Sequence, residues 1–401
     1  MKNMRGAAAW IVLCGGIIMG LALGVRHVQG LFLLPMTADR GWGRELFAFA
    51  IALQNLVWGF AQPFTGMVAD RFGATRVLLG GLVLYAAGLW LMSTTISPIA
   101  FTLSAGLVIG VALSATSFAV VYGALGRIVA PERRSWALGL AGAVGGFGQF
   151  LIVPGTQALL AAFDWTSTLL ILALASACLV PLAFALRGDS SAGGEPGPAL
   201  SLRAAIAEAL AHRGFWLLNL GFLACGFQLA FIGAHLPAYL LDHGLQPRAA
   251  VIALSLVALA NVAGTYLCGH LGGLYRRKHL LSGIYLLRSL AMTLFVLLPL
   301  SEPSVYAFSL VMGLIWLGTV PLTTGLVAQV FGVRYLSTLF GFVFFGHQLG
   351  AFFGVWLGGH VFDATRSYDA IWLGAILLGV AAALLHWPID DAQVRRVAQP
   401  A

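Results

Sequence analysis

Long apolar segments recur along almost the whole of this 401-residue chain, separated by short turns that contain polar residues, proline or glycine. A helix needs about 20 apolar residues to cross the hydrocarbon core of a bilayer. We place twelve such segments, at 8–36, 46–69, 76–94, 97–126, 136–160, 166–187, 214–241, 248–272, 279–300, 303–330, 336–361 and 368–388. The chain is therefore predicted to be an all-α integral membrane protein with twelve transmembrane helices. A membrane barrel would require period-two alternation, which the segments lack.

Composition excludes a soluble protein. Hydrophobic residues make up 60% of the chain and charged residues only 9%. A globular domain needs far more surface charge than this to stay in water. The basic start, with Lys2 and Arg5, is typical of a secretory signal, but the apolar run that follows is too long for one. We expect that run to remain as the first helix.

Basic residues predict the orientation of the chain. With the N-terminus inside, sixteen of the 22 Lys and Arg residues fall on the cytoplasmic face and four on the other, while Arg26 and Arg288 lie within the membrane. This asymmetry follows the positive-inside rule. We expect both termini in the cytoplasm and the protein in the plasma membrane, which in a bacterium is the inner membrane. The net charge of +8 then reflects topology and attraction to lipid, and it indicates no nucleic-acid partner.

A polar linker divides the chain nearly in half. Residues 188–200, GDSSAGGEPGPAL, are rich in Gly, Ser and Pro and should be flexible. Ser201 is a suitable N-cap for a short helix that follows. We predict an N-terminal six-helix bundle at 1–187, a cytoplasmic linker with a short helix at 188–212, and a C-terminal six-helix bundle at 213–401.

The two halves resemble each other. A shift of about 200 residues aligns Pro35 with Pro237, and GMVADRFGATRVLLGG at 66–81 with GHLGGLYRRKHLLSGI at 269–284. The same shift sets Arg26 opposite Gln228. Internal repeats of this kind are typical of transporters whose two halves rock about a central site.

The loop after the second segment carries the most specific motif. GMVADRFGATR resembles the loop signature of the major facilitator superfamily, G-x-x-x-D-[RK]-x-G-x-[RK]-[RK], and departs from it at Thr75. The matching residues are Gly66, Asp70, Arg71, Gly73 and Arg76. With twelve segments, a central linker and a weaker second copy of the loop, the resemblance covers almost the whole chain. It implies two pseudo-symmetric six-helix bundles and a transporter rather than an enzyme.

This loop is expected to gate a conformational change. Gly66 and Gly73 permit close backbone approach, and Asp70 can accept hydrogen bonds from a helix N-terminus or pair with Arg127. Such contacts would lock one conformation, and the resemblance implies the same gating role. Gly273 stands at the Asp70 position of the second copy, so any lock is asymmetric. The alternative is a solvated turn, in which charge pairs contribute little.

The charges within the membrane predict the substrate class. All fourteen Asp and Glu residues lie in loops or at segment ends. A carrier of cations, or one with a carboxylate proton relay, needs an acid at membrane depth. The groups that remain at depth are basic or neutral, which favours a small organic anion such as a monocarboxylate.

Arg26 is the main candidate for binding that anion. It lies deep in the first segment, where a cation is costly and usually functional, and its planar guanidinium suits a carboxylate. Gln29 shares its helix face, while His27 points about 100° away. In the superfamily the first segment lines the cavity, so the resemblance implies a cavity-facing Arg26. The alternative is that Arg26 only ties helices together through carbonyl oxygens.

Other polar residues at membrane depth are weaker candidates. Most such residues form interhelical hydrogen bonds worth ~0.6 kcal/mol on average. Arg288, on the ninth segment, is either structural or a ligand contact. The remaining substrate-binding candidates are Asn55, Tyr122, Gln228 and His347.

Uptake of an anion against a negative-inside potential costs about 2.3 kcal/mol per charge per 100 mV. We expect secondary active transport by alternating access, with proton symport as one source of the driving force. His27 is the candidate proton site, and His347 is a second, since an ordinary histidine pKa near 6.5 suits the task. Exchange against another anion would need no such group. The sequence indicates no cofactor, no metal site and no obligate protein partner. The expected partners are the anionic substrate and the lipid bilayer.

Within the superfamily, the chain is similar to the monocarboxylate and oxalate/formate branch through GVRHVQGLFLLPM in its first segment and through its length. That branch typically places an arginine in the eighth segment. Here that segment has Asn261 and Thr265, so Arg26 or Arg288 would have to substitute. An efflux carrier for neutral or amphipathic compounds has the same fold and is the alternative. A membrane enzyme is disfavoured, since motifs such as G-x-S-x-G and H-E-x-x-H do not occur.

Overall fold

The computed structural model describes residues 2–42, 44–187 and 200–394, and every regular element in these ranges is helical. Eleven helical stretches among them are long and apolar enough to cross a membrane. The second of the twelve expected segments corresponds to α3 (Arg44–Phe72), which is not one of the eleven and carries Gln54, Asn55 and Gln62. The structure confirms an all-α membrane architecture.

The helices follow the expected segments in order. Those of the first six segments are α1 (Lys2–Val28), η1 (Gln29–Phe32), α2 (Leu33–Arg40), α3, α4 (Ala74–Thr94), α5 (Pro98–Phe101), η2 (Thr102–Val108), α6 (Ile109–Thr116), α7 (Phe118–Ile128), α8 (Pro131–Ala162), α9 (Trp165–Cys178) and η3 (Val180–Leu186). Those of the remaining segments are α11 (Arg213–Asp242), α12 (Pro247–Leu274), α13 (Arg277–Leu297), α14 (Glu302–Leu314), α15 (Thr319–Phe331), α16 (Leu336–Thr365) and α17 (Asp369–His386).

Contacts divide the chain into two compact units. Unit 1 comprises Met1–Ala130, Val144–Gly193 and Arg334–Gly341; unit 2 comprises Pro131–Ala143, Gly194–Val333 and Phe342–Ala401, as far as these residues are described. Two long helices are therefore shared, because α8 begins in unit 2 and α16 begins in unit 1. The bundle boundaries that we predict at 187 and 213 remain a proposal.

The predicted linker falls largely outside the described residues, which resume at Leu200. The short helix expected after it is α10 (Leu202–Ala211). Ser201 caps this helix by accepting a hydrogen bond from the backbone N–H of Ala204.

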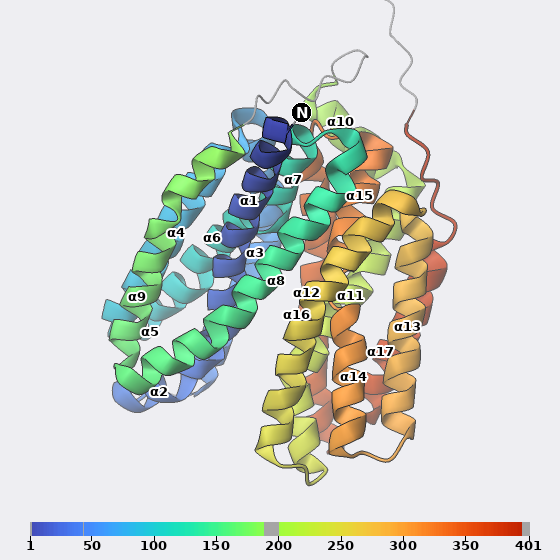
Figure 1. The fold of residues 1–401 in the computed structure, drawn as a ribbon. Helices are drawn as coiled ribbons and strands as arrows, with labels where there is room; N and C mark the ends of the chain where they lie inside the picture. Colours follow the sequence, from blue (N-terminus) through green and yellow to red (C-terminus); the bar gives the residue numbers. More distant parts are fainter. Residues whose placement is uncertain (1, 43, 188–199, 395–401) are drawn as a thin grey trace, which may run out of the picture. The chain divides into compact units, whose positions relative to one another are not determined.

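Helices within each unit pack closely. In unit 2, α12 runs alongside α14, and α13 runs alongside α17 (Figure 1). In unit 1, α4 packs against α6 and α9. Gly20 on α1 faces Gly145 and Gly148 on α8, where an added Cβ would lie 3.1 Å from the Cα of Gly148. Small residues at such crossings let membrane helices approach until their backbones touch.

The fourth and tenth of the segments that we predict as continuous are interrupted by non-helical residues, while the first and sixth change from α-helix to 3-10 helix near Gln29 and Val180. The fourth segment is interrupted at Ser117, between α6 and α7, and the tenth at residues 315–318, between α14 and α15. A broken helix leaves backbone groups without helical partners, and at membrane depth these must be satisfied by neighbouring side chains. In each unit, candidate residues lie close to the break of that unit, Arg26 through Trp58 in unit 1 and Gln228 through Arg288 in unit 2.

Candidate substrate site and gating loop

Arg26 lies near the C-terminal end of α1 and is half-buried in unit 1. Its Nη2 donates a hydrogen bond to Oδ1 of Asn55 on α3, and its guanidinium lies 5.2 Å from the centroid of the Trp58 ring. Its Nε is buried without a hydrogen-bond partner among the described residues. Three ion pairs occur among all the described residues of the chain, and none of them includes Arg26. The charge is therefore held by an amide and an aromatic face, and one donor remains available.

Trp58 is itself fixed by hydrogen bonds. Its Nε1 donates to Oε1 of Gln62 at 2.9 Å and to Oγ of Ser117 at 3.0 Å. Gln62 Nε2 in turn donates to the carbonyl of Ser114 at 2.7 Å. Ser117 has extended backbone, with φ −103° and ψ −162°, where α6 ends and α7 begins. These bonds tie two side chains of α3, Trp58 and Gln62, to the break in the fourth segment, and they fix the Trp58 ring next to Arg26.

Two further candidates in unit 1 are buried polar groups without partners. Gln29, the first residue of η1, is 1% exposed, and neither of its amide atoms has a hydrogen-bond partner among the described residues. Tyr122 on α7 is fully buried and its hydroxyl likewise has none, while its ring meets Phe118 edge-on at 5.7 Å. A buried polar group left unpaired costs roughly 1–3 kcal/mol. A ligand that bonded to these groups would recover that cost.

Arg288 in unit 2 has the opposite environment. It is fully buried, and its five N–H donors are matched by five hydrogen bonds. Nε and Nη2 both donate to the carbonyl of Ile315, Nη2 also donates to that of Trp316, and Nη1 donates to Cys225 Sγ and Gln228 Oε1. Two of its acceptors are carbonyls freed by the break between α14 and α15. These contacts make Arg288 a structural support of the break, with no donor left for a ligand.

The two breaks are related by the internal repeat. Under the shift of 202 to 203 residues, Ser117 in unit 1 falls at positions 319–320, directly after the break in unit 2, and Gln62 falls at 264–265, within one turn of Asn261. Each amide side chain serves the break in its own unit. Gln62 donates to a carbonyl at the end of α6, and Asn261 Oδ1 accepts from the N–H of Leu317 at 3.0 Å. Interrupted helices at corresponding positions of two repeats are typical of transporter binding sites.

The candidates Gln228 and His347 both lie in unit 2. Gln228 is fully buried, accepts from Arg288, and donates through Nε2 to the carbonyl of Ala375 at 2.9 Å. His347 stacks on Phe344, with ring centroids 5.3 Å apart. Its Nδ1 lies 3.2 Å from Gln348 Oε1, and its Nε2 is buried without a partner among the described residues. Both polar atoms of the Gln228 amide are therefore bonded, whereas one ring nitrogen of His347 is not.

His27 is exposed on α1, whereas its neighbour Arg26 is half-buried. Consecutive helical residues point about 100° apart, so His27 lies on a different face of α1 from Arg26. It is nevertheless close enough to Arg26 to interact with its charge.

The loop for which we predict a gating role, residues 66–76, holds a buried ion pair. The Asp70 carboxylate accepts from Arg127 Nη1 at 2.5 Å, and its other contacts are with the first residues of α16. The N–H of Ser337 donates to Oδ1, while the N–H and the hydroxyl of Thr338 both donate to Oδ2 at 2.7 Å. Gly66 lies against the same turn, since an added Cβ would meet the Ser337 carbonyl at 2.5 Å. Asp70 thus binds a helix N-terminus and a cation together, two partners that the sequence predicts as alternatives.

The other residues of the loop signature lie outside this pair. Gly73 adopts φ +91°, a conformation that favours glycine, and it turns the chain from α3 into α4. Arg71 and Arg76 are exposed, and the Arg71 guanidinium lies 5.1 Å from the ring centroid of Phe72.

Sequence reasoning missed the two breaks and Asn261 as a partner of the second. The only local signal for the first was the polar run of Ser114, Thr116 and Ser117 in an otherwise apolar segment. Such hydroxyls commonly bond within their own helix, as Thr116 does to Ala112. The run therefore does not by itself indicate an interruption.

Known proteins are similar to this chain in sequence. A profile of the Major Facilitator Superfamily matches residues 12–355. The uncharacterized MFS-type transporter YcxA of Bacillus subtilis is 24% identical, with 96% of each chain covered. Monocarboxylate transporter 11 of Homo sapiens is 28% identical, covering 93% of this chain and 81% of its own.

Solved structures resemble the fold at low sequence identity. The E. coli fucose:proton symporter FucP has a TM-score of 0.68 at 16% identity and covers 94% of this chain and 97% of its own. The proton:xylose symporter XylE has a TM-score of 0.73 at 15% identity and covers 96% of this chain and 95% of its own. At such identities the likeness concerns the fold alone.

Replacing Asp70 with Asn should destabilise the protein by about 3–5 kcal/mol, because Arg127 would be left buried without its counter-ion. The side chains of Arg127 and Asp70 are only 5% and 0% exposed. Asp39→Asn is the matched control, since Asp39 pairs with Arg40 at 3.4 Å and is 51% exposed. That change should cost less than about 1 kcal/mol. Thermal unfolding in detergent measures both, and equal shifts would contradict the assignment of a buried lock.

Proposed function

Because the chain belongs to the major facilitator superfamily it is a membrane transporter and not an enzyme, and we propose that it carries small organic anions, monocarboxylates above all, as a secondary active transporter working by alternating access. Arg26 carries this proposal. It is a guanidinium at membrane depth with no carboxylate partner among the described residues and with an unpaired buried donor. Cations are kept in such places at a cost and usually for function.

The contrast with Arg288 strengthens this choice. Both arginines lie within the membrane segments, but Arg288 donates five hydrogen bonds to acceptors of the protein. An arginine that only ties helices together should resemble Arg288. Both guanidinium groups lie against a ring, Tyr285 for Arg288 and Trp58 for Arg26, but Arg26 has one amide partner and an unpaired buried donor. Several curated relatives named as monocarboxylate transporters agree with an anionic cargo for this chain.

We assign the remaining candidates accordingly. Asn55 orients Arg26, since its own Nδ2 is fixed by the carbonyl of Ile51 at 3.1 Å and its Oδ1 accepts from the guanidinium. Gln29 and Tyr122 offer unpaired buried groups for the polar parts of a substrate. In the second half, the unpaired nitrogen of His347 makes it a stronger candidate than Gln228, whose amide is already bonded.

The gating loop and the membrane orientation complete the proposal. Asp70 and Arg127, with Gly66, Arg71, Gly73 and Arg76 in the same loop, would hold the first residues of α16 in one state and release them in the other. The distribution of basic residues, by the positive-inside rule, supports a cytoplasmic position for both termini. In a bacterium the protein would lie in the inner membrane.

Arg26→Gln should reduce uptake of radiolabelled L-lactate, pyruvate and oxalate by reconstituted protein to background, because the amide retains hydrogen bonding but loses the positive charge. Arg26→Lys should keep part of the activity, since lysine keeps the charge but not the planar fork. Arg203→Gln removes an exposed cation on α10, outside the cluster, and should leave uptake unchanged. Wild-type rates in Arg26→Gln would favour a neutral cargo, and no carboxylate uptake by the wild type would sink the proposal.

His27→Gln tests proton coupling in the same vesicles. If an exposed histidine on α1 carries the proton, an inward proton gradient should no longer stimulate uptake, while exchange between anions should persist. His360→Gln, a second exposed-face histidine outside the cluster, is the control. Stimulation that is undiminished in His27→Gln would rule out this role.

A further inference from the structure

We propose that Trp58 is the positioning residue of the anion site, and that Gln62 and Ser117 hold its indole so that the Arg26 guanidinium rests on the ring and stays away from backbone carbonyls. This inference rests on the proposed function. Trp58 is 4% exposed and its Nε1 is shared between two oxygens, so the ring plane is fixed. The face of an indole attracts a guanidinium most strongly among aromatic rings.

In unit 2 the arginine at the break also lies against a ring, 5.4 Å from the centroid of Tyr285, so the two units differ in which groups bond to the carbonyls of the break. There the arginine itself bonds to the carbonyls of Ile315 and Trp316, and its donors are all used. In unit 1 the corresponding carbonyl, that of Ser114, is taken by Gln62. Trp58 then occupies the space between this bonded break and Arg26. The neutral pair Gln62 and Trp58 satisfies the break, which leaves the Arg26 charge available.

This arrangement predicts that Trp58 acts on affinity through Arg26. A ring that only filled space would affect folding and the amount of active carrier, with no change in the substrate concentration at half-maximal uptake. A ring that aims the guanidinium would change that concentration and leave the maximal rate nearly intact.

Uptake kinetics for the carboxylate that wild type carries best will separate these roles. Trp58→Phe keeps an aromatic face but lacks the N–H, and should raise KM about tenfold with Vmax within about twofold. Ser117→Ala keeps the ring and removes one of its two acceptors, and should raise KM about threefold. Ser117→Thr restores a hydroxyl and should return KM to the wild-type value. Trp165→Phe is the control, because Trp165 stacks with Arg40, 5.1 Å away, outside the cluster.

Each outcome decides the matter. If Arg26→Gln abolishes uptake but Trp58→Phe and Ser117→Ala keep the wild-type KM, the positioning role is wrong and the anion site stands. If those variants lower Vmax alone, Trp58 is structural. If Arg26→Gln transports normally, the proposed function fails and the role of Trp58 fails with it.

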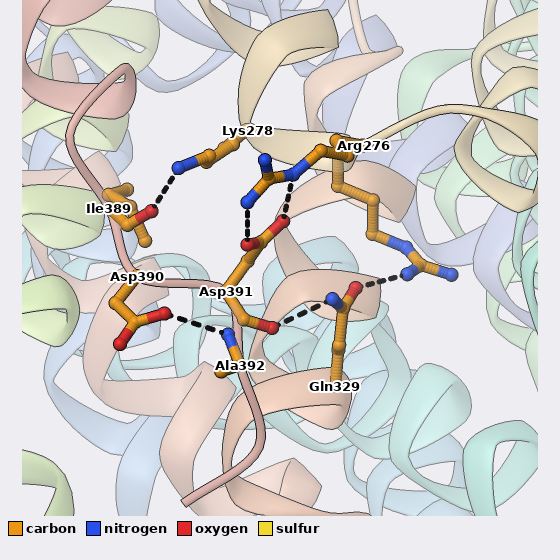
Figure 2. Close-up of polar contacts among 8 residues, drawn as sticks. Arg276, Lys278, Gln329, Ile389, Asp390, Asp391 and Ala392 are labelled. Carbon is orange, nitrogen blue, oxygen red and sulfur yellow. Dashed lines mark hydrogen bonds and ion pairs between the residues drawn. The ribbon is translucent and has the colours of Figure 1, made fainter.

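A separate set of contacts in unit 2 involves the segment after α17, residues 387–394. The Asp391 carboxylate binds the Arg276 guanidinium through two hydrogen bonds, of 2.5 and 3.1 Å (Figure 2). Lys278 Nζ donates to the carbonyl of Ile389 at 2.6 Å, and Gln329 Nε2 donates to that of Asp391 at 2.8 Å. Further along, the N–H of Val394 donates to the carbonyl of Val330 at 2.9 Å. The segment is thus bonded to the start of α13 and to the end of α15.

We infer that this segment is a strap that clamps the last turn of α15 to the start of α13, and that Asp391 supplies the carboxylate that the second loop copy lacks at Gly273. In the first copy, Asp70 comes from the loop itself. In the second, the carboxylate arrives from the C-terminal segment and is 7% exposed. Since α15 begins at a break that Arg288 holds, the strap would fix its other end.

The strap is built to stay closed at neutral pH. Hydrogen bonds from Arg276 lower the pKa of Asp391 below its ordinary value. A carboxyl whose pKa is lowered in the folded state stabilises that state above its unfolded pKa. The contribution disappears only as the pH falls through the lowered folded value.

Amide hydrogen exchange of the full-length protein in nanodiscs tests the strap without any substrate. Asp391→Asn should speed exchange about fivefold in peptides that cover 387–394 and 326–331. Arg276→Gln should do the same, and the double variant should add little, because both changes remove one bond. Asp390→Asn is the control, since Asp390 is exposed and its carboxylate accepts from Ala392 N–H within its own segment. Wild-type exchange in Asp391→Asn, or equal acceleration in Asp390→Asn, would overturn the strap.

Discussion

A guanidinium inside a membrane must be satisfied by the protein around it, because lipid supplies neither water nor counter-ions. The two membrane-depth arginines of this chain meet that requirement differently. Arg288 uses carbonyls freed by a broken helix together with two side chains, and it ends with every donor bonded. Arg26 rests on an indole and one amide, and it keeps a buried donor unpaired. The functional argument depends on this difference.

The internal repeat allows the surroundings of the two arginines to be compared at similar positions in the two units. Both units contain a helix broken at a similar position of the repeat, and in both an amide from the second segment of the repeat, Gln62 or Asn261, bonds to the break. Unit 2 adds an arginine to the break. Unit 1 adds Trp58, which is neutral and turns its face to a cation on α1. In unit 2 the interruption is thus stabilised by an arginine. In unit 1 it is stabilised by neutral side chains, one of which holds its ring against Arg26.

Carboxylates outside the membrane segments follow a similar division. Asp70 lies in the first loop copy and binds Arg127 and the start of α16. The second copy has Gly273 at that position, and its basic residues Arg276 and Lys278 bind the segment that follows α17 instead. A carboxylate with several directed donors is a rigid attachment point. Each unit has one, although the two carboxylates come from different parts of the chain.

Hydropathy alone determined the class of protein, the helical content and the order of the segments, because a membrane-spanning helix is a local property of about 20 residues. The loop motif indicated the family, and charge accounting selected Arg26, since a lone cation in an apolar run is visible in one dimension. Tertiary structure alone decided which arginine has all its donors bonded within the protein and which has a donor left unpaired. That depends on partners far apart in sequence, such as Gln62 with Ser117, Arg288 with Ile315, and Arg276 with Asp391. The helix breaks belong to this second group, because an interruption at membrane depth is stable only where distant side chains satisfy its backbone groups.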